Sequence, residues 1–196
     1  MINLEKFTSL DIILASKSPR RQALLKEMGL TFRVAIKDVD ESYPTDLEPG
    51  EVAEYIACKK ANAFELTTEE ELIIAADTIV CVENRILGKP KDEQDAFQMI
   101  CSLSGRSHEV ITGVALASVN DFRVFHEKTT VYFHSLSEDE IWYYIHQYKP
   151  FDKAGAYGIQ EWIGAVGIDR IAGSYNNVVG LPTDKLYREI VQMLPL

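Results

Sequence analysis

Arg20 and Arg21 are adjacent in the sequence and directly follow Ser18 and Pro19. Ser18 is a typical helix N-cap and Pro19 suits the first helical position, so both arginines fall in the first turn of a predicted helix. Cations are unfavourable there, because the helix dipole already places positive charge at this end. Backbone N–H groups, a serine hydroxyl and two guanidinium groups at one helix start are suited to binding a phosphate. The sequence therefore predicts an anion site at this position.

Arg21 is predicted to project from the core-facing side of that helix. Leu24, Leu25 and Met28 follow it by three, four and seven positions, the spacing of residues that share one helix face. A lone arginine in such a place usually extends its charge out of the helix end or pairs with a carboxylate. The second arginine and the serine favour a phosphate ligand instead. The site is not a P-loop, because the glycine-rich turn and its Gly-Lys-Ser/Thr ending are absent.

Asp77 interrupts the apolar run LIIAADTIVCV at residues 72–82. Apolar residues occupy both faces of this predicted strand, which indicates that it is buried. A buried carboxylate needs a partner or a function, and a structural salt bridge is the alternative to a catalytic role. We favour function, because Thr78 adds a neighbouring hydroxyl and perturbed carboxylates concentrate in active sites. Lys89, in the loop sequence LGKP, supplies a cation that could return to the same end of the sheet.

Three other segments carry weaker signals. In DKAGAYGIQ, two glycines permit close backbone approach to a ligand, and Gln160 offers the donor and acceptor groups that read a nucleobase edge; a tight turn is the alternative. Glu41 lies in an acidic loop, which is usually only solvated. Lys59 and Lys60 are adjacent on a predicted helix, and periodicity does not rank them.

The elements that must position these residues alternate between strands and helices, with no internal repeat or linker. This pattern predicts an α/β fold with a mixed sheet, because helix-linked strands and a hairpin are both present. The predicted strands are residues 11–16, 31–36, 72–82, 108–118, 122–136 and 163–168. The first predicted helix begins at Pro19 after the cap Ser18 and stops at Gly29. The other predicted helices are residues 50–66, residues 92–103, one that follows a capping box of Ser137 and Glu140 and runs to about 148, and one that begins near 182. A turn and loop are expected at 83–90 and a loop before 182.

Composition limits the classes of partner. The net charge is −10, from 20 basic and 30 acidic residues, and no stretch collects the cations needed to follow a nucleic acid polymer. No apolar run is long enough to cross a membrane, and the first residues lack the features of a signal peptide. The cysteines are odd in number and far apart, so we expect reduced thiols and a cytoplasmic protein. Neither they nor the four histidines have metal-ligand spacing.

Motifs along nearly the whole chain, from about Ile12 to Leu194, resemble those of the Maf family of nucleoside triphosphate pyrophosphatases, once named for septum formation. The resemblance implies a mixed α/β fold like that of inosine triphosphatases, with two lobes around a deep cleft, in a single domain over residues 1–196, and frequently a homodimer. It also implies hydrolysis of a nucleoside triphosphate to the monophosphate and pyrophosphate with a divalent metal, Mg²⁺ or Mn²⁺. The motifs are LASKSPRRQALL, DVDES, AADTIV, LGKP, LSGRSHEVITGVAL, DKAGAYGIQ and GSYNNVVGLP.

Three positions indicate the branch of the family. Members that prefer dTTP and UTP have Arg in the third position of Ser-Pro-Arg-Arg, Thr after the Asp, and Gln at the end of the GIQ segment. This chain has Arg20, Thr78 and Gln160 at these positions, and the resemblance makes them substrate-binding residues. The branch that acts on 7-methyl-GTP has an aromatic residue at the first position and an acidic residue at the last, and it is the alternative within the family.

The resemblance also assigns roles to the remaining candidates. It implies phosphate binding by Ser18 and Arg21, neutralisation of the triphosphate by Lys60 and Lys89, metal binding by Glu41 with Asp77, and general base catalysis by Asp77. A regulatory protein that senses nucleotides and acts on division through a partner is the alternative to an enzyme. Two carboxylates beside a polyanion weaken simple binding, so they favour the enzyme.

Overall fold

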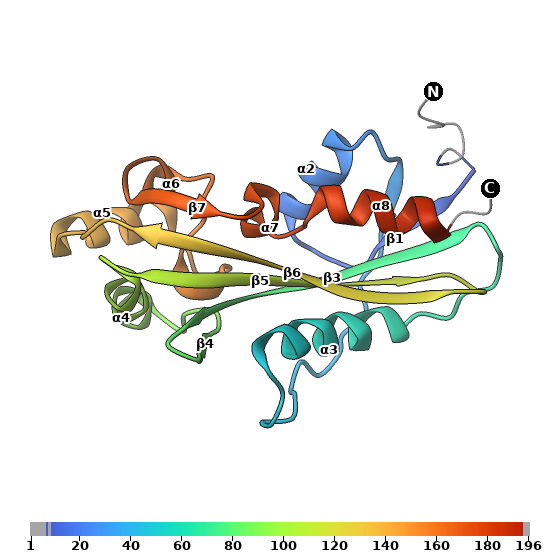
Figure 1. The fold of residues 1–196 in the computed structure, drawn as a ribbon, viewed down its shortest axis with the longest axis horizontal. Coiled ribbons are helices and arrows are strands. Elements are labelled where there is room, and N and C mark those ends of the chain that lie inside the picture. Colours follow the sequence, from blue (N-terminus) through green and yellow to red (C-terminus); the bar gives the residue numbers. More distant parts are fainter. Residues whose placement is uncertain (1–6, 8, 194–196) are drawn as a thin grey trace. The chain divides into compact units, whose positions relative to one another are not determined.

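The strands of this chain form a mixed sheet, as the sequence predicts (Figure 1). The structure, a computed structural model, describes residue 7 and residues 9–193. In this part of the chain seven strands follow the order β2-β1-β3-β5-β6-β7, with β4 paired to β3. The strands are β1 (Asp11–Leu14), β2 (Phe32–Val34), β3 (Glu71–Val82), β4 (Arg85–Leu87), β5 (Ser107–Ala117), β6 (Phe122–Phe133) and β7 (Ile168–Ala172). The helices are α2 (Pro19–Glu27), α3 (Pro49–Asn62), α4 (Glu93–Leu103), α5 (Glu138–Tyr148), the 3₁₀ turn η1 (Ala154–Ala156), α6 (Trp162–Val166), α7 (Tyr175–Val179) and α8 (Thr183–Met193).

The chain divides into two compact units, and each long strand contributes to both. The first unit comprises the residues up to Asp77, residues 112–127 and the residues from Gly180 onward. The second unit comprises residues 78–111 and 128–179. The boundary in β3 falls directly after Asp77, so that residue closes one unit and Thr78 opens the other.

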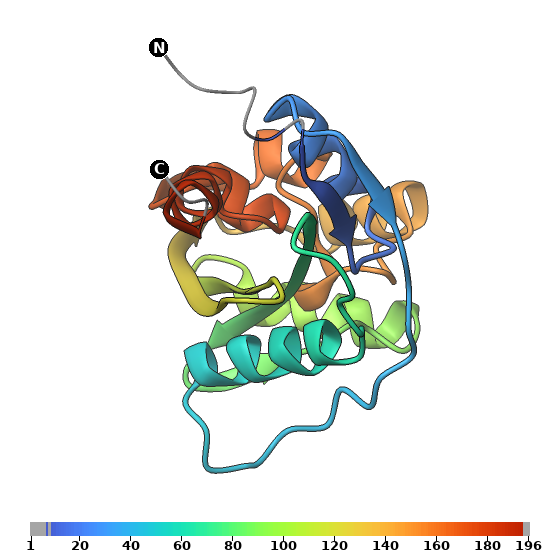
Figure 2. The same ribbon diagram turned by 90° about the vertical axis from the view of Figure 1, so that its right-hand side faces the viewer.

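In the first unit, helices cover both faces of the sheet. β1 pairs in parallel with β2 and with β3. α3 lies along one face, where the buried Ala57 and Ala61 contact Ile13 and Ile73, and α2 and α8 lie on the opposite face (Figures 1 and 2). Burying apolar side chains between a sheet and helices is the main stabilising contribution in such a layered arrangement.

α3 approaches β5 at a position that admits no side chain. A Cβ added to Gly113 of β5 would lie 2.3 Å from the carbonyl carbon of Ala53 and 2.4 Å from its oxygen. These distances are far inside van der Waals contact, and both neighbouring atoms belong to the backbone. The separation of α3 from the sheet is therefore determined by glycine.

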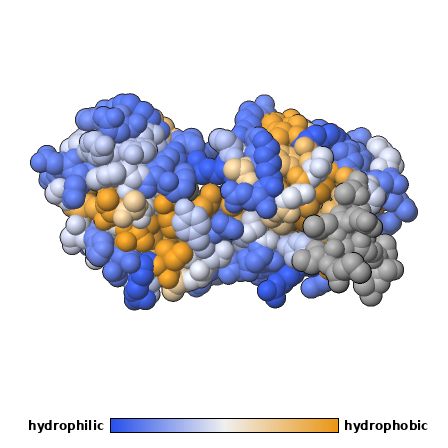
Figure 3. All heavy atoms as spheres, turned by 90° about the horizontal axis from the view of Figure 1, so that it is seen from above, coloured by the Kyte–Doolittle hydropathy of each residue, from blue (hydrophilic) through white to orange (hydrophobic). Residues whose placement is uncertain are grey.

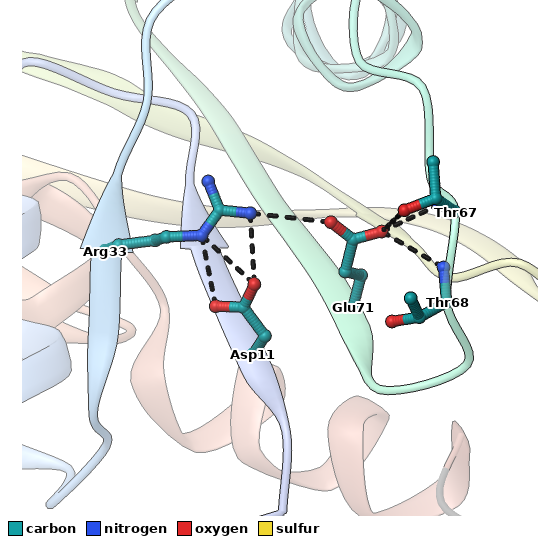
Figure 4. Close-up of polar contacts among 5 residues, drawn as sticks. All are labelled: Asp11, Arg33, Thr67, Thr68 and Glu71. Carbon is teal, nitrogen blue, oxygen red and sulfur yellow. Dashed lines mark hydrogen bonds and ion pairs between the residues drawn. The ribbon is translucent and has the colours of Figure 1, made fainter.

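An ion-pair network joins the amino ends of the parallel strands (Figure 4). Arg33 of β2 donates from Nε to both carboxylate oxygens of Asp11 at 3.1 Å, and its Nη2 lies 3.5 Å from Glu71 Oε1. Glu71 Oε2 in turn accepts from the backbone N–H groups of Thr67, at 2.7 Å, and Thr68, at 3.2 Å. The network accompanies a register that pairs Asp11 with Glu71, so that β1 and β3 begin at the same edge of the sheet.

The core of the second unit is apolar and contains a buried histidine. His108 of β5 is 2% exposed, its Nε2 lies 2.7 Å from the Tyr157 hydroxyl, and its ring meets those of Phe133 and Tyr157 edge to face. Its Nδ1 has no hydrogen-bond partner within the described residues. Burial lowers the pKa of His108 from 6.5 to about 4, so the ring is neutral at physiological pH.

Several local predictions are confirmed. Ser18 caps α2 and accepts from the Arg21 N–H at 3.4 Å. Ser137 and Glu140 form a capping box at the start of α5. These signals are local side chain-to-backbone contacts, which explains why a sequence reveals them.

Other predictions of elements are wrong. The helix expected to reach residue 66 ends at Asn62. The strand expected at 163–168 is the helix α6 followed by β7, because a short apolar run does not distinguish the two. Residues 85–87, expected in a turn and loop, form β4 through antiparallel pairing with β3, and the expected loop before 182 contains α7. The formation of β4 and of α7 depends on contacts with segments that are distant in the sequence.

Hydrophilic residues cover much of the surface drawn in Figure 3, with hydrophobic residues gathered in patches among them. None of the helices in the described part of the chain is long and apolar enough to cross a membrane. The cysteines Cys58, Cys81 and Cys101 are thiols.

Candidate active site

Arg21 turns inward from the first turn of α2, as its spacing predicts. Its Nε donates to the carbonyl oxygen of Gly180 at 2.8 Å, and its Nη1 donates to the carbonyl oxygen of Ala76 at 2.8 Å and to Ser16 Oγ at 3.2 Å. Ala76 precedes Asp77 on β3. The guanidinium therefore connects the start of α2 to the strand position that carries the candidate carboxylate.

The electrostatic surroundings of Arg21 show that the candidates of the first unit are close together. Burial is the largest effect on Arg21 and lowers its pKa. The Asp77 carboxylate raises that pKa, Arg20 lowers it, and Glu41 raises it. An arginine remains protonated under physiological conditions, so the Arg21 guanidinium lies in the field of one further guanidinium and two carboxylates.

Lys60 connects the two carboxylates directly. Its Nζ lies 2.7 Å from Asp77 Oδ1 and 2.9 Å from Glu41 Oε1. The side chains of Lys60 and Asp77 are each only 16% exposed, whereas that of Glu41 is 52% exposed. Asp77 thus has the salt-bridge partner that the structural interpretation required, but the partner is itself a candidate phosphate ligand.

The adjacent lysine has a different contact. Lys59 Nζ donates to the carbonyl oxygen of Ser42 at 3.0 Å and lies 3.6 Å from Asp40 Oδ2. Asp40 accepts from the backbone N–H and the hydroxyl of Ser42, and these hydrogen bonds lower the pKa of Asp40. Lys60 is therefore the one of the pair that lies beside Asp77, while Lys59 holds the loop that carries Glu41.

The two carboxylates form a donor set that suits a hard divalent cation. Oxygens of Asp77 and Glu41 both lie within 2.9 Å of one ammonium nitrogen, so they already converge on a positive charge. Carboxylate oxygen is the ligand type that Mg²⁺ and Mn²⁺ prefer, and Mg²⁺ commonly takes one or two carboxylates together with substrate phosphates and water. No group of three or more potential protein ligands occurs in the part of the chain that the structure describes.

The other candidates lie in the second unit. Thr78 follows Asp77 on β3 and is partly buried, while Lys89 and Gln160 are exposed. Gly155 N–H donates to the Gly88 carbonyl oxygen at 3.0 Å, which joins the loop of Lys89 to the segment that leads to Gln160. These two residues therefore lie on connected segments.

The two glycines of DKAGAYGIQ occupy positions that suit a residue without a side chain. Gly155 has a φ of 68°, in the left-handed region. A Cβ on Gly158 would lie 2.7 Å from Gln160 Nε2, so the amide of Gln160 packs directly over this glycine. The turn that the sequence leaves as an alternative is thus present, and it also holds the residue expected to contact a base.

Sequence reasoning missed several residues around these candidates. Ser16 and Gly180 bind Arg21, and Gly180 does so through its carbonyl group, for which a sequence carries no side-chain signal. Lys153 and Glu161 lie within or beside the quoted motif, 3.0 Å apart between Nζ and Oε1. The lysine is buried, which its position in an apolar and glycine-rich segment could have indicated.

Comparisons with known proteins identify relatives that are similar in sequence and a solved structure that shares the fold. A dTTP/UTP pyrophosphatase from Phocaeicola vulgatus is 51% identical over 193 residues, which cover 97% of this chain and 98% of that protein. A dTTP/UTP pyrophosphatase from Flavobacterium johnsoniae is 49% identical over 191 residues, which cover 97% and 98%. The structure of a HAM1 protein from Coxiella burnetii has a TM-score of 0.50 at 18% identity, over 93% of this chain and 99% of that chain, which indicates a shared fold.

The family model of Maf-like proteins matches residues 11–193, from the first strand to the end of α8. That range contains both arginines of α2, the Lys60 contact between the carboxylates, and the glutamine segment. Because the family model matches this range and two relatives are 49% and 51% identical over nearly their full length, this chain belongs to the Maf family.

Proposed function

We propose that this chain hydrolyses dTTP and UTP to the nucleoside monophosphate and pyrophosphate. Relatives at 49% and 51% identity that extend over almost the same length are named dTTP/UTP pyrophosphatases. The observation on which the proposal rests is the contact of Lys60 with both Asp77 and Glu41. It puts a cation that suits phosphate beside a carboxylate that suits proton transfer.

The residues of the first unit divide the chemical work. The first turn of α2, with Ser18 and Arg21, binds phosphate oxygens, because N–H groups and a guanidinium favour an anion there. Lys60 offsets charge that develops on the leaving pyrophosphate, and the resemblance to the family supports the same role for Lys89. Lys60 exchanges its contact with Asp77 for a phosphate oxygen, since a triphosphate competes strongly for the ammonium.

Asp77 then acts as the general base. Released from Lys60, its carboxylate accepts a proton from the water that attacks the α-phosphorus, and the bond between that phosphorus and the bridging oxygen breaks. Pyrophosphate leaves with the electron pair of this bond. Asp77 and Glu41 would hold a divalent metal, Mg²⁺ or Mn²⁺, which would supply positive charge against the charge of the triphosphate.

Base selection is assigned to the residues of the branch pattern. Gln160 faces solvent and offers an amide NH₂ and a carbonyl, which together match the N–H of a thymine or uracil ring and one of the two carbonyls beside it. Arg20 and Thr78 complete the pattern. The branch of the family that acts on 7-methyl-GTP has, at the position of Gln160, an acidic residue, which offers acceptors only. Because this chain has a glutamine there, we expect 7-methyl-GTP to be the less favoured substrate.

The resemblance to the family also supports a cytoplasmic homodimer of single-domain chains, with a nucleoside triphosphate as its small-molecule partner. Sedimentation of the purified protein with and without nucleotide tests the dimer. A monomer at micromolar concentration under both conditions contradicts it.

The function is tested with a nucleotide panel. Purified wild type is incubated with dTTP, UTP, CTP, GTP and 7-methyl-GTP in Mg²⁺, and the products are separated. Pyrophosphate and monophosphate from dTTP and UTP are expected, with other bases slower. Asp77→Asn is expected to lose turnover by about 10² or more, the contribution of a general base, while triphosphate binding persists. Orthophosphate as the primary product, or near-normal turnover of folded Asp77→Asn, contradicts the assignment.

A further inference from the structure

Two buried side chains hold Glu161, the residue directly after Gln160. The Tyr144 hydroxyl of α5 donates to Glu161 Oε2, and Lys153 Nζ lies 3.0 Å from Glu161 Oε1. Tyr144 has no exposed surface and Lys153 is only 7% exposed. Lys153 Nζ also lies 2.7 Å from Asp152 Oδ1, but the Asp152 side chain is 57% exposed, whereas that of Glu161 is 17% exposed. A buried charge and a buried hydroxyl are costly unless their partners are well placed, so the Glu161 carboxylate stabilises both groups.

The same tyrosine also holds the backbone before Gln160. The hydroxyl oxygen of Tyr144 accepts from the Gly158 N–H at 3.0 Å. Burial and the hydrogen bond to Glu161 raise the pKa of Tyr144, so the hydroxyl remains protonated and acts as donor and acceptor together. Gln160 therefore lies between two residues, 158 and 161, that are tied to a single buried oxygen atom.

The side chain of Gln160 packs within this arrangement. At Gly158 an added Cβ would lie 2.7 Å from Gln160 Nε2, 3.0 Å from Lys153 Cε and 3.1 Å from Glu161 Cδ. One point over the glycine is thus surrounded by the amide of Gln160 and by the two charged side chains. The last torsion of a glutamine is broad, so an exposed amide needs such neighbours to hold one orientation.

We propose that Tyr144, Lys153 and Glu161 form a positioning network that orients the Gln160 amide and thereby sets the preference among nucleobases. This inference rests on the proposed function, in which Gln160 reads the base. The three residues act through Gln160 and the 158–161 segment, so they are positioning residues. Loss of the network lets the amide turn, and an amide with its donor and acceptor exchanged no longer matches a thymine or uracil edge.

The test compares substitutions on one helix. Tyr144→Phe removes only the shared hydroxyl oxygen, and Tyr143→Phe, at a residue 48% exposed, is the matched control. kcat/KM is measured for dTTP, UTP, CTP and GTP. In Tyr144→Phe, kcat/KM for dTTP relative to that for CTP or GTP is expected to fall about tenfold, which corresponds to about 1.4 kcal/mol. The decrease is expected in a higher KM for dTTP with little change in kcat for GTP, and the control keeps the wild-type ratio.

Glu161→Gln keeps the side-chain shape and decides the matter if Tyr144→Phe does not fold. It leaves Lys153 without one of its carboxylates, and the same fall in the ratio is expected. If folded variants keep the wild-type ratio, or lose activity on every nucleotide by the same factor, the network is only structural and the inference is overturned. The proposed function is tested separately, by the substrates that the wild type hydrolyses. The network is tested by the difference in base preference between the variants and the wild type, whichever base the wild type prefers.

Discussion

The buried His108 makes the stability of this protein depend on pH, and the size of the effect follows from its surroundings. The ring is 2% exposed, and burial lowers its pKa from 6.5 to about 4. Between those two values the unfolded chain binds a proton that the folded chain does not. Stability therefore rises with pH in this window, and it is lost as the pH falls below about 6.5.

The magnitude follows from the two pKa values. A separation of about 2.5 pH units at about 1.36 kcal/mol per unit gives about 3 kcal/mol in full. Between pH 7 and pH 5 the protonation equilibria of the folded and unfolded states give about 2 kcal/mol, before the folded ring itself begins to titrate. This is a large fraction of the 5–15 kcal/mol (approximate range) that stabilises ordinary domains.

The assay is urea unfolding at pH 7, 6 and 5 for the wild type, for His108→Gln and for His134→Gln. His108→Gln keeps polar groups near the Tyr157 hydroxyl but does not titrate, and His134 is a control whose side chain is 57% exposed. The wild type and the control are expected to lose about 2 kcal/mol more than His108→Gln between pH 7 and pH 5. Equal pH dependence in all three proteins would refute the reasoning, whatever their absolute stabilities.

Two further predictions concern ligand contacts. Arg21→Ala removes charge-assisted contacts worth about 1.5 to 3 kcal/mol, so nucleotide affinity or turnover is expected to fall while circular dichroism shows a folded protein; an unfolded variant whose folded fraction is fully active indicates a structural role. Gln160→Glu presents a carboxylate to pyrimidine carbonyls and is expected to lower kcat/KM for dTTP and UTP about tenfold to a hundredfold relative to GTP and 7-methyl-GTP. An equal decrease for all substrates shows that Gln160 does not read the base.

The features of the site that the sequence predicts are those set by neighbouring residues. Ser18 caps α2 and Arg21 faces inward, because capping and helical spacing depend only on the next few positions. The mixed α/β fold is predicted from the alternation of strands and helices, because each of these elements is itself indicated by the pattern of neighbouring residues. The assigned roles in catalysis and binding stay predictions.

The features that the sequence leaves open depend on contacts between distant segments. Lys59 and Lys60 are equivalent by periodicity, and only the packing of α3 against β3 places Lys60 beside Asp77. β4 exists because β3 offers an edge, and α6 replaces a predicted strand because short apolar runs fit either state. The role of Glu161 is invisible without Tyr144, which lies 17 residues earlier on α5.

Gly113 has a consequence for sequence variation in this protein. The glycine touches α3 at Ala53, and Lys60 lies about two helical turns further along the same rigid helix. An alanine at 113 would have to lift α3 from the sheet, and with it the ammonium that spans Asp77 and Glu41. A genetic variant at this buried and chemically inert position would therefore behave like a lesion in the active site, although every residue that carries chemistry is unchanged.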